Sequence, residues 1–316
     1  MESFKPQTLM QARRNFLKQA GLLLAGSTVY PFLSQAKEHT LAAKPIGIQL
    51  FTVFEPMNKD PQGTLKQIAA IGYKEIESAF SSRGGYYGYK PKEFKALVED
   101  LGMKWRSHHA VGAPFKPRPG MKLPTGSDGK PMTIPPMLNL RDNYQQLVDD
   151  AAEAGLKYLV CASTPVATMD EINSSIEVFQ KTGEASKKAG LQFAYHNHAT
   201  EFDPVEGGKT PYEVILKQTS PDLVKMELDL AWATKAGKDP VALFKEHPGR
   251  FPLWHIKDIK KDLNAITEVG NGVVDFKHAF AAAKIAGLKY FFVEQDLAPS
   301  MDSIKTSYEH LSKILA

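Results

Sequence analysis

The feature that most constrains this fold is a regular alternation between short apolar runs and longer stretches with helical periodicity. The runs, rich in β-branched and aromatic residues, cover 46–52, 75–80, 104–110, 157–163, 191–197, 224–230, 252–258 and 290–295. Apolar strands separated by helices predict a parallel sheet that is covered by those helices. Eight strand–helix units in about 270 residues are typical of a closed (β/α)8 barrel.

A doubly wound open sheet is the alternative α/β architecture. Such a sheet usually carries a Gly-rich phosphate loop after its first strand, and segment 51–63 (FTVFEPMNKDPQG) is not one. Several helical stretches end on glycine, as expected at helix C-termini: Gly72, Gly102, Gly155, Gly190 and Gly287. We therefore expect a single α/β domain, a (β/α)8 TIM barrel, over residues 44–316.

The N-terminal segment has the features of an export signal in the right order. An arginine pair opens residues 13–18 (RRNFLK), an apolar stretch covers 20–33, and small residues suited to a signal peptidase lie at 34–36. The RRNFLK segment resembles the twin-arginine export motif. A membrane span needs ~20 apolar residues, so a membrane anchor is disfavoured. We expect residues 1–36 to be a signal peptide and the mature protein to lie in the periplasm.

Composition narrows the classes of partner. The net charge is +4, and part of it lies in the N-terminal segment, so no basic field for nucleic acid is expected. The chain has one cysteine, Cys161, so an intramolecular disulfide is excluded. Self-association as a homo-oligomer is left open.

A Pro- and Gly-rich segment, residues 111–139, lies between the third strand and its helix. Long loops inside compact domains are usually functional. We expect this segment to contact substrate or to act as a lid on the catalytic rim, without regular secondary structure.

Polar residues follow four consecutive strands at the carboxyl ends, where barrel enzymes carry their chemistry. They include His196, Asp229, His255 and Glu294. Taken singly, each residue could be a helix cap or a hydrogen-bonded core residue. Taken together, they must be paired or bind a metal, because burying charged groups without partners costs free energy. Mixed nitrogen and oxygen donors suit a divalent Mn, Zn, Co or Fe ion. Glu227 lies on the same strand as Asp229, and we leave open whether its side chain points outward into the helix layer.

The order of four motifs carries a family resemblance. YHNH (195–198), ELDLAW (227–232), HIKD (255–258) and VEQD (293–296) resemble those of the xylose isomerase-like TIM barrels. That superfamily includes sugar phosphate isomerases and epimerases, inosose dehydratases and type IV apurinic endonucleases. The resemblance runs from about residue 46 to the end, and its fold is the barrel expected above.

The resemblance implies a metal held by His196, Asp229, His255 and Glu294. Ketose epimerases carry Glu, Asp, His and Glu at these places, so His196 departs from their pattern. It also implies proton abstraction next to a carbonyl, with a metal-stabilised enediolate. Glu294 remains as one base, and the other proton carrier is expected among His108, His109 and His198.

Three further residues are candidates for substrate contact. His108 follows the third strand beside His109, and Trp232 stands where the epimerases and endonucleases have a histidine. Trp232 can stack on a sugar face or pack in the helix layer. Lys257 can meet substrate hydroxyls or a phosphate, or it can be a solvated loop charge.

These observations favour a metal-dependent isomerase or epimerase acting on a small carbohydrate. The alternative is a lyase or dehydratase acting on a keto-sugar, a 3-keto-glycoside or an inosose. A non-catalytic carbohydrate-binding barrel is disfavoured by Glu294 and the rim histidines. A repair endonuclease is disfavoured by the export signal and an incomplete histidine set.

Overall fold

The computed structural model describes residues 44–114 and 137–316, and these fall within one compact unit, Thr40–Ala316. The predicted signal peptide and most of the predicted loop over 111–139 lie outside the described residues. No helix among the described residues is long and apolar enough to span a bilayer.

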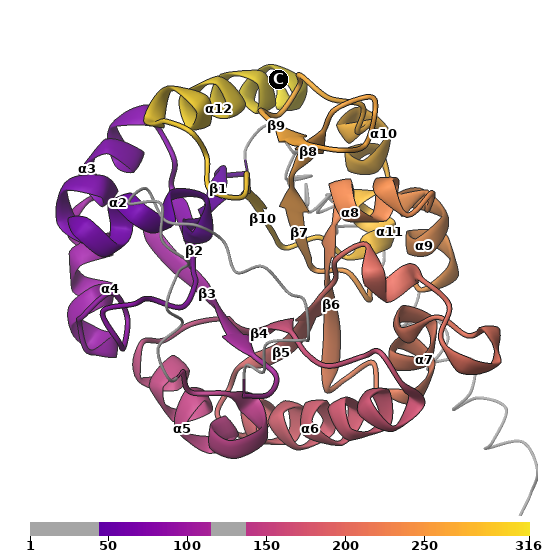
Figure 1. Cartoon of the computed structure of the whole chain (residues 1–316). Helices are drawn as coiled ribbons and strands as arrows, with labels where there is room; N and C mark the ends of the chain where they lie inside the picture. The colour runs from indigo at the N-terminus through magenta and orange to yellow at the C-terminus, as the bar shows by residue number, and fades with distance from the viewer. Residues whose placement is uncertain (1–43, 115–136) are drawn as a thin grey trace, which may run out of the picture. The chain divides into compact units, whose positions relative to one another are not determined.

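Eight parallel strands close into a barrel, which confirms the predicted fold (Figure 1). They are β1 (Gly47–Gln49), β2 (Glu75–Ser78), β3 (Lys104–Val111), β4 (Tyr158–Ser163), β5 (Gln192–His196), β6 (Val224–Asp229), β7 (Leu253–Ile256) and β10 (Tyr290–Val293). Each pairs with its neighbours, and closure comes from β1 pairing with both β2 and β10. Closure leaves this sheet without a free edge.

Helices surround the strands and form the outer ring in Figure 1. They are α2 (Phe54–Lys59), α3 (Pro61–Ile71), α4 (Pro91–Asp100), α5 (Leu140–Glu153), α6 (Met169–Lys188), α7 (Pro211–Gln218), α8 (Leu230–Lys235), α9 (Pro240–Glu246), α10 (Phe276–Ala281), α11 (Ala283–Ala286) and α12 (Met301–Leu315). Short 3-10 turns cover Leu50–Val53, Thr200–Phe202 and Glu206–Gly208. Asp, Asn, Ser or Thr side chains accept a backbone N–H at many of the N-termini, for example Asp60 from Gly63 and Ser300 from Ser303.

Most of the strands are shorter than the predicted runs, and for two of them the structure shows the reason. The run over 46–52 leaves β geometry at Leu50, because the Gln49 side chain accepts the Phe51 N–H at 2.9 Å and starts a 3-10 turn. The run over 252–258 divides into β7 and β8 (Asp258–Ile259), and β8 pairs with β9 (Ile266–Thr267) in a small hairpin. The Asp258 carboxylate accepts backbone N–H groups from Ile259, Gly270, Gly272 and Val274, and so fixes the loop after the hairpin.

The helical stretch predicted to end at Gly287 is interrupted. It forms α10 and α11, which meet at Ala282. It ends at Gly287, whose φ of +78° is the left-handed conformation that favours glycine at a helix C-terminus. A side chain there would also lie 3.0 Å from the Gly249 backbone.

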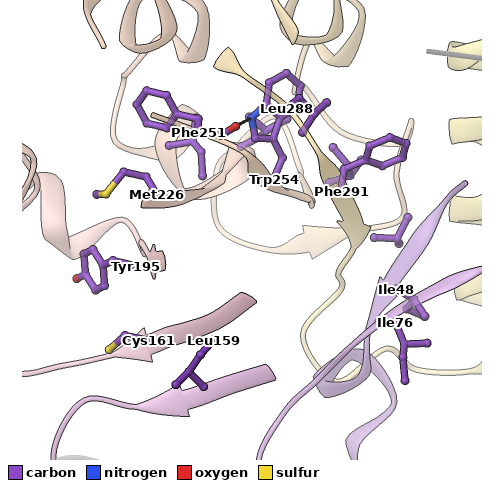
Figure 2. Packing of buried hydrophobic residues seen from close by; sticks show 14 of the residues in the cluster. Ile48, Ile76, Leu159, Cys161, Tyr195, Met226, Phe251, Trp254, Leu288 and Phe291 are labelled. Atoms are coloured by element: carbon purple, nitrogen blue, oxygen red, sulfur yellow. Dashed lines mark hydrogen bonds between the residues drawn. The ribbon is translucent and has the colours of Figure 1, made fainter. Parts of the chain in front are cut away.

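Residues that alternate along the strands divide the core in two. Outward side chains pack under the helices and include Ile48, Ile76, Leu159, Tyr195, Met226, Trp254 and Phe291 (Figure 2). Trp254 is held by a hydrogen bond from its indole N–H to the Phe251 carbonyl, at 3.1 Å. Inward side chains form a separate apolar plug of Tyr158, Val160, Ala194, Leu253 and Phe292. Burying one large apolar side chain stabilises the fold by about 1.5–3 kcal/mol.

Candidate active site and metal centre

A charged layer lies directly beside the apolar plug. On β5, β7 and β10, the inward positions two residues beyond Ala194, Leu253 and Phe292 are His196, His255 and Glu294. Residues two apart share a face of a strand, so these polar side chains enter the same interior. All three are at least 96% buried.

His255 is the centre of this layer. Its Nδ1 lies 2.6 Å from Glu294 Oε2, and its Nε2 lies 2.7 Å from Glu77 Oε1 and 3.2 Å from Glu227 Oε2. Burial alone would lower the pKa of His255, but Glu227 and Glu294 outweigh it and raise that pKa well above its usual range. Carboxylates therefore surround both ring nitrogens.

Glu227 faces the barrel interior, so the outward orientation left open for it is wrong. Its Oε2 lies 2.6 Å from His109 Nε2 and 3.2 Å from His196 Nδ1. The physical reason is strand periodicity: Glu227 is two residues from the inward Asp229 and must share its face. Burial, and then repulsion from Glu77, raises the pKa of Glu227 to about 7.

His109 belongs to the same cluster, whereas His108 does not. His109 Nε2 is 3.0 Å from Glu77 Oε1, in addition to its contact with Glu227. Burial would lower the pKa of His109, but Glu77 and Glu227 raise it to about 9, which suits an acid at neutral pH better than a base. His108, its neighbour on β3, bonds Ser78 Oγ through Nδ1 at 2.8 Å. Burial and His109 lower the pKa of His108 to about 3.

Lys257 is buried, so the solvated-loop alternative is wrong for it. The side chain is 2% exposed, and its ammonium lies 3.1 Å from Asp229, 2.8 Å from Glu294 and 3.0 Å from Asp296. A buried lysine is tolerated only with such partners. Burial would raise the pKa of Glu294, but Lys257 and His255 hold it well below its usual range, so this carboxylate is ionised.

The four residues predicted to hold a metal converge. One donor atom from each of His196, Asp229, His255 and Glu294 lies within 4.8 Å of the others, and a second group shares two of the histidines and adds His109 and Glu227. Asp229 Oδ2 is buried without a hydrogen bond, although Lys257 is its ion-pair neighbour.

The donor set fits a divalent cation. Burial, and then His255, lowers the pKa of His196 well below its usual value, which leaves the neutral imidazole that metals bind. Two imidazoles and two carboxylates match the donor preference of Zn, Mn, Co or Fe ions. Moreover, Glu77, Glu227, Asp229 and Glu294 are four buried carboxylates, and Lys257 is the one buried ammonium that contacts this group in the described ranges. His109 and His255, whose pKa values are raised, balance part of this charge as imidazolium ions, and a cation that binds would take the place of the His255 proton.

His198 lies at the mouth of this site rather than in its floor. Its side chain is 42% exposed, and its ring centroid is 5.0 Å from that of His196. Behind it, buried Glu201 accepts the His198 backbone N–H at 2.9 Å and places Oε1 3.7 Å from His198 Nδ1. Glu201 therefore fixes the turn that presents His198.

A cavity of about 230 Å³ opens over the charged layer. Its walls include Phe51, Phe80, His109, His196, His198, Glu294 and Asp296. It joins apolar walls to a few converging polar groups, as small-molecule sites do. Trp232 is not among the lining residues; its ring lies 5.0 Å from the Lys257 ammonium and 6.3 Å from the His198 ring.

Sequence reasoning did not assign to the site several residues that the structure places there: Glu77, Glu227, Asp296 and Glu201. Period-two alternation gave a usable signal for Glu227, two residues before Asp229. Glu77 stands on β2, whose inward positions carry two glutamates, so it could have been found in the same way. Nothing local to the sequence indicated that Glu201 would turn back onto His198.

Comparison with known proteins agrees with this architecture. The family model of the xylose isomerase-like TIM barrel matches residues 65–314. Inosose dehydratase from Geobacillus thermodenitrificans is 26% identical over 156 residues, which are 42% of this chain and 51% of that protein. The alignment thus spans about half the length of that curated relative.

Two crystal structures of sugar phosphate isomerase/epimerases from Parabacteroides distasonis are also similar. One is 25% identical, with a TM-score of 0.70, over 86% of this chain and 99% of that chain. The other is 26% identical, with a TM-score of 0.67, over 84% and 93%. The fold, the charged layer and the match over most of the chain define one class of protein: this chain belongs to the xylose isomerase-like TIM barrel family.

Proposed function

We propose that this protein is a metal-dependent sugar isomerase or epimerase that removes a proton next to a carbonyl. The observation that carries the proposal is the convergence of His196, Asp229, His255 and Glu294 at the floor of an open cavity. The similarity to sugar phosphate isomerase/epimerases supports this class of reaction.

Each residue has a definite part in such a reaction. The bound cation would supply a Lewis acid for the carbonyl oxygen. Glu294 is ionised and borders the cavity, so it is the base that takes the proton. Lys257 orients Glu294 and Asp229 by holding both carboxylates.

A second proton carrier is available on another wall. His198 borders the cavity from the turn after β5, whereas Glu294 borders it from the end of β10. A proton returned from a different direction gives epimerisation, and a proton returned to the neighbouring carbon gives isomerisation.

Elimination is the second candidate, because the curated relatives are inosose dehydratases. It begins with the same proton removal by Glu294, followed by loss of a β-substituent. His109 contacts Glu227 and Glu77 and is protonated at neutral pH, so it can supply the acid for a leaving oxygen.

Deuterium exchange separates these outcomes. The purified, Mn²⁺-loaded protein is incubated in D₂O with free ketoses and then with 3-keto-glucosides, and the products are followed by NMR. Deuterium next to the carbonyl without bond loss supports isomerase or epimerase chemistry, whereas release of water or an aglycone supports elimination. If no substrate exchanges, proton abstraction is the wrong reaction class.

The metal site has its own test. Elemental analysis should find about one divalent ion in the wild type and much less in His255→Ala, because His255 lies at the centre of the donor set. His278→Ala is the matched control, since that histidine is exposed on α10. If the wild type and His255→Ala held equal amounts of metal, the four-ligand site would be ruled out.

We also propose that the protein is exported to the periplasm. The support is the arginine pair, the apolar stretch and the cleavage-site pattern of residues 1–36. Replacing Arg13 and Arg14 by lysine should retain the protein in the cytoplasmic fraction at its uncleaved mass. Export of the double variant at the wild-type level would contradict the twin-arginine route.

A further inference from the structure

A second cavity adjoins the one over the metal site. It measures about 160 Å³, against about 230 Å³ for the first cavity, and the two share Phe80, His109 and Val111 in their walls. The second cavity therefore offers space beside the one that lies over the metal site.

The walls of this second cavity are largely apolar. Leu138, Leu147 and Tyr86 line it. The Tyr86 ring is fixed by edge contacts with Trp105 and His108, with centroids 4.7 and 4.9 Å apart. Rigid aromatic walls of this kind suit a planar or ring-shaped group.

One polar group in the wall has no hydrogen-bond partner among the described residues. The Tyr86 hydroxyl is buried and makes no hydrogen bond with the described residues, and the residue is only 4% exposed. Asp150 lines the same cavity. Burying a hydroxyl without a partner costs free energy. A ligand that forms a hydrogen bond with the Tyr86 hydroxyl would therefore bind more tightly.

His108 offers a second donor. The Trp105 indole N–H donates to Ser78 Oγ at 2.8 Å. The Ser78 hydroxyl lies 2.8 Å from His108 Nδ1 but 3.5 Å from the Ser107 carbonyl, so it donates to His108. The proton of the neutral imidazole is thereby assigned to Nε2, on the side of the ring away from Ser78.

We propose that the second cavity binds a ring carried by the substrate, so that the substrate is a glycoside with an aromatic, hydroxyl-bearing aglycone. The carbonyl sugar would lie over the metal site and the aglycone against Tyr86 and His108. This inference rests on the proposed function for the position of the sugar ring. The adjoining cavities, the apolar walls and the Tyr86 hydroxyl, which has no partner among the described residues, carry it.

Binding tests the idea without turnover. The purified protein is titrated with 4-hydroxyphenyl β-D-glucoside and with methyl β-D-glucoside by calorimetry. The aryl glucoside should bind at least about tenfold more tightly, since an aromatic ring placed in an apolar pocket contributes on this scale. Equal affinities, or no binding of the aryl glucoside, would overturn the proposal.

Two variants localise the effect. Tyr86→Phe should reduce the preference for the aryl glucoside about tenfold, because a hydrogen bond of the bound ligand is lost. Leu138→Trp should abolish the preference by filling the cavity, and a 40% exposed position tolerates the larger side chain. Tyr89→Phe removes a hydroxyl three residues away and, since Tyr89 does not line the cavity, should keep the wild-type preference. Preference retained in both Tyr86→Phe and Leu138→Trp would place the aglycone elsewhere.

The outcome separates this inference from the proposed function. Aryl preference without deuterium exchange on any substrate leaves the second cavity standing and rejects the proposed reaction. Exchange on a ketose without aryl preference rejects the second cavity alone.

Discussion

Two layers of the barrel interior lie two residues apart along the strands but differ in polarity. The first layer contains Leu253 and Phe292 and is apolar, whereas the next contains His255 and Glu294 and is charged. Both layers use the same strand geometry and are buried. The apolar layer stabilises the fold by burial, and the charged layer loses solvation that only partners or a cation can restore.

The two layers are thus expected to have different roles: the apolar layer stabilises the fold, and the charged layer carries the candidate metal-binding and catalytic groups. In the apolar layer the cost of a change should appear in unfolding, and in the charged layer it should appear in metal content and turnover. The four predictions below test that division, beginning with the largest expected effect.

The largest effect on the fold is expected from Phe292→Ala. Phe292 is fully buried in the plug, so truncation should cost about 3–5 kcal/mol in the free energy of unfolding, measured by urea denaturation. Phe292→Leu is the matched control and should cost much less, because it leaves a smaller cavity. A loss below about 1 kcal/mol for the alanine variant would mean that the plug is not closely packed.

Glu294→Gln should have the complementary effect on turnover. Removal of the base should lower the rate of deuterium exchange about 10²–10⁴-fold, measured by NMR with the metal-loaded protein. Glu309→Gln, at an exposed position of α12, is the control and should exchange at the wild-type rate. Unchanged exchange in Glu294→Gln would assign the base to another residue.

Metal removal should distinguish the two layers directly. At a metal concentration 100 times Kd, chelation should cost the wild type about 2.7 kcal/mol of stability, seen as a lower Tm. Phe292→Ala should show the same chelator shift, since the apolar plug contains no metal donor, and His255→Ala should show almost none. If chelation lowered the Tm of His255→Ala as much as that of the wild type, the metal would not be bound by the charged layer.

The smallest effect is expected at the cavity mouth. Glu201→Gln keeps the size of the side chain but removes the charge beside His198, so exchange should fall about tenfold, which equals about 1.4 kcal/mol. Glu206→Gln, an exposed neighbour in the same loop region, should leave the rate unchanged. If the two variants behave alike, Glu201 only stabilises the turn.

Much of this architecture was predictable from local patterns. Eight β-branched runs and their intervening helices predicted the barrel because each signal lies within one segment. The boundaries at Gln49 and Asp258 were not predictable in that way, since they depend on side chains that accept backbone N–H groups, from Phe51 at Gln49 and from the distant Gly270 at Asp258. The carboxyl-end rule identified the strands that carry His196, Asp229, His255 and Glu294, but it did not give their contacts.

The eight-unit periodicity and the family motifs follow from the sequence alone, because they depend on residue spacing along one element. Only the tertiary structure decided that Lys257 is buried among Asp229, Glu294 and Asp296, that Glu227 joins three histidines, and that a second cavity opens beside His109. These contacts join strands far apart in the chain. Their geometry depends on barrel closure and register, which no local pattern encodes.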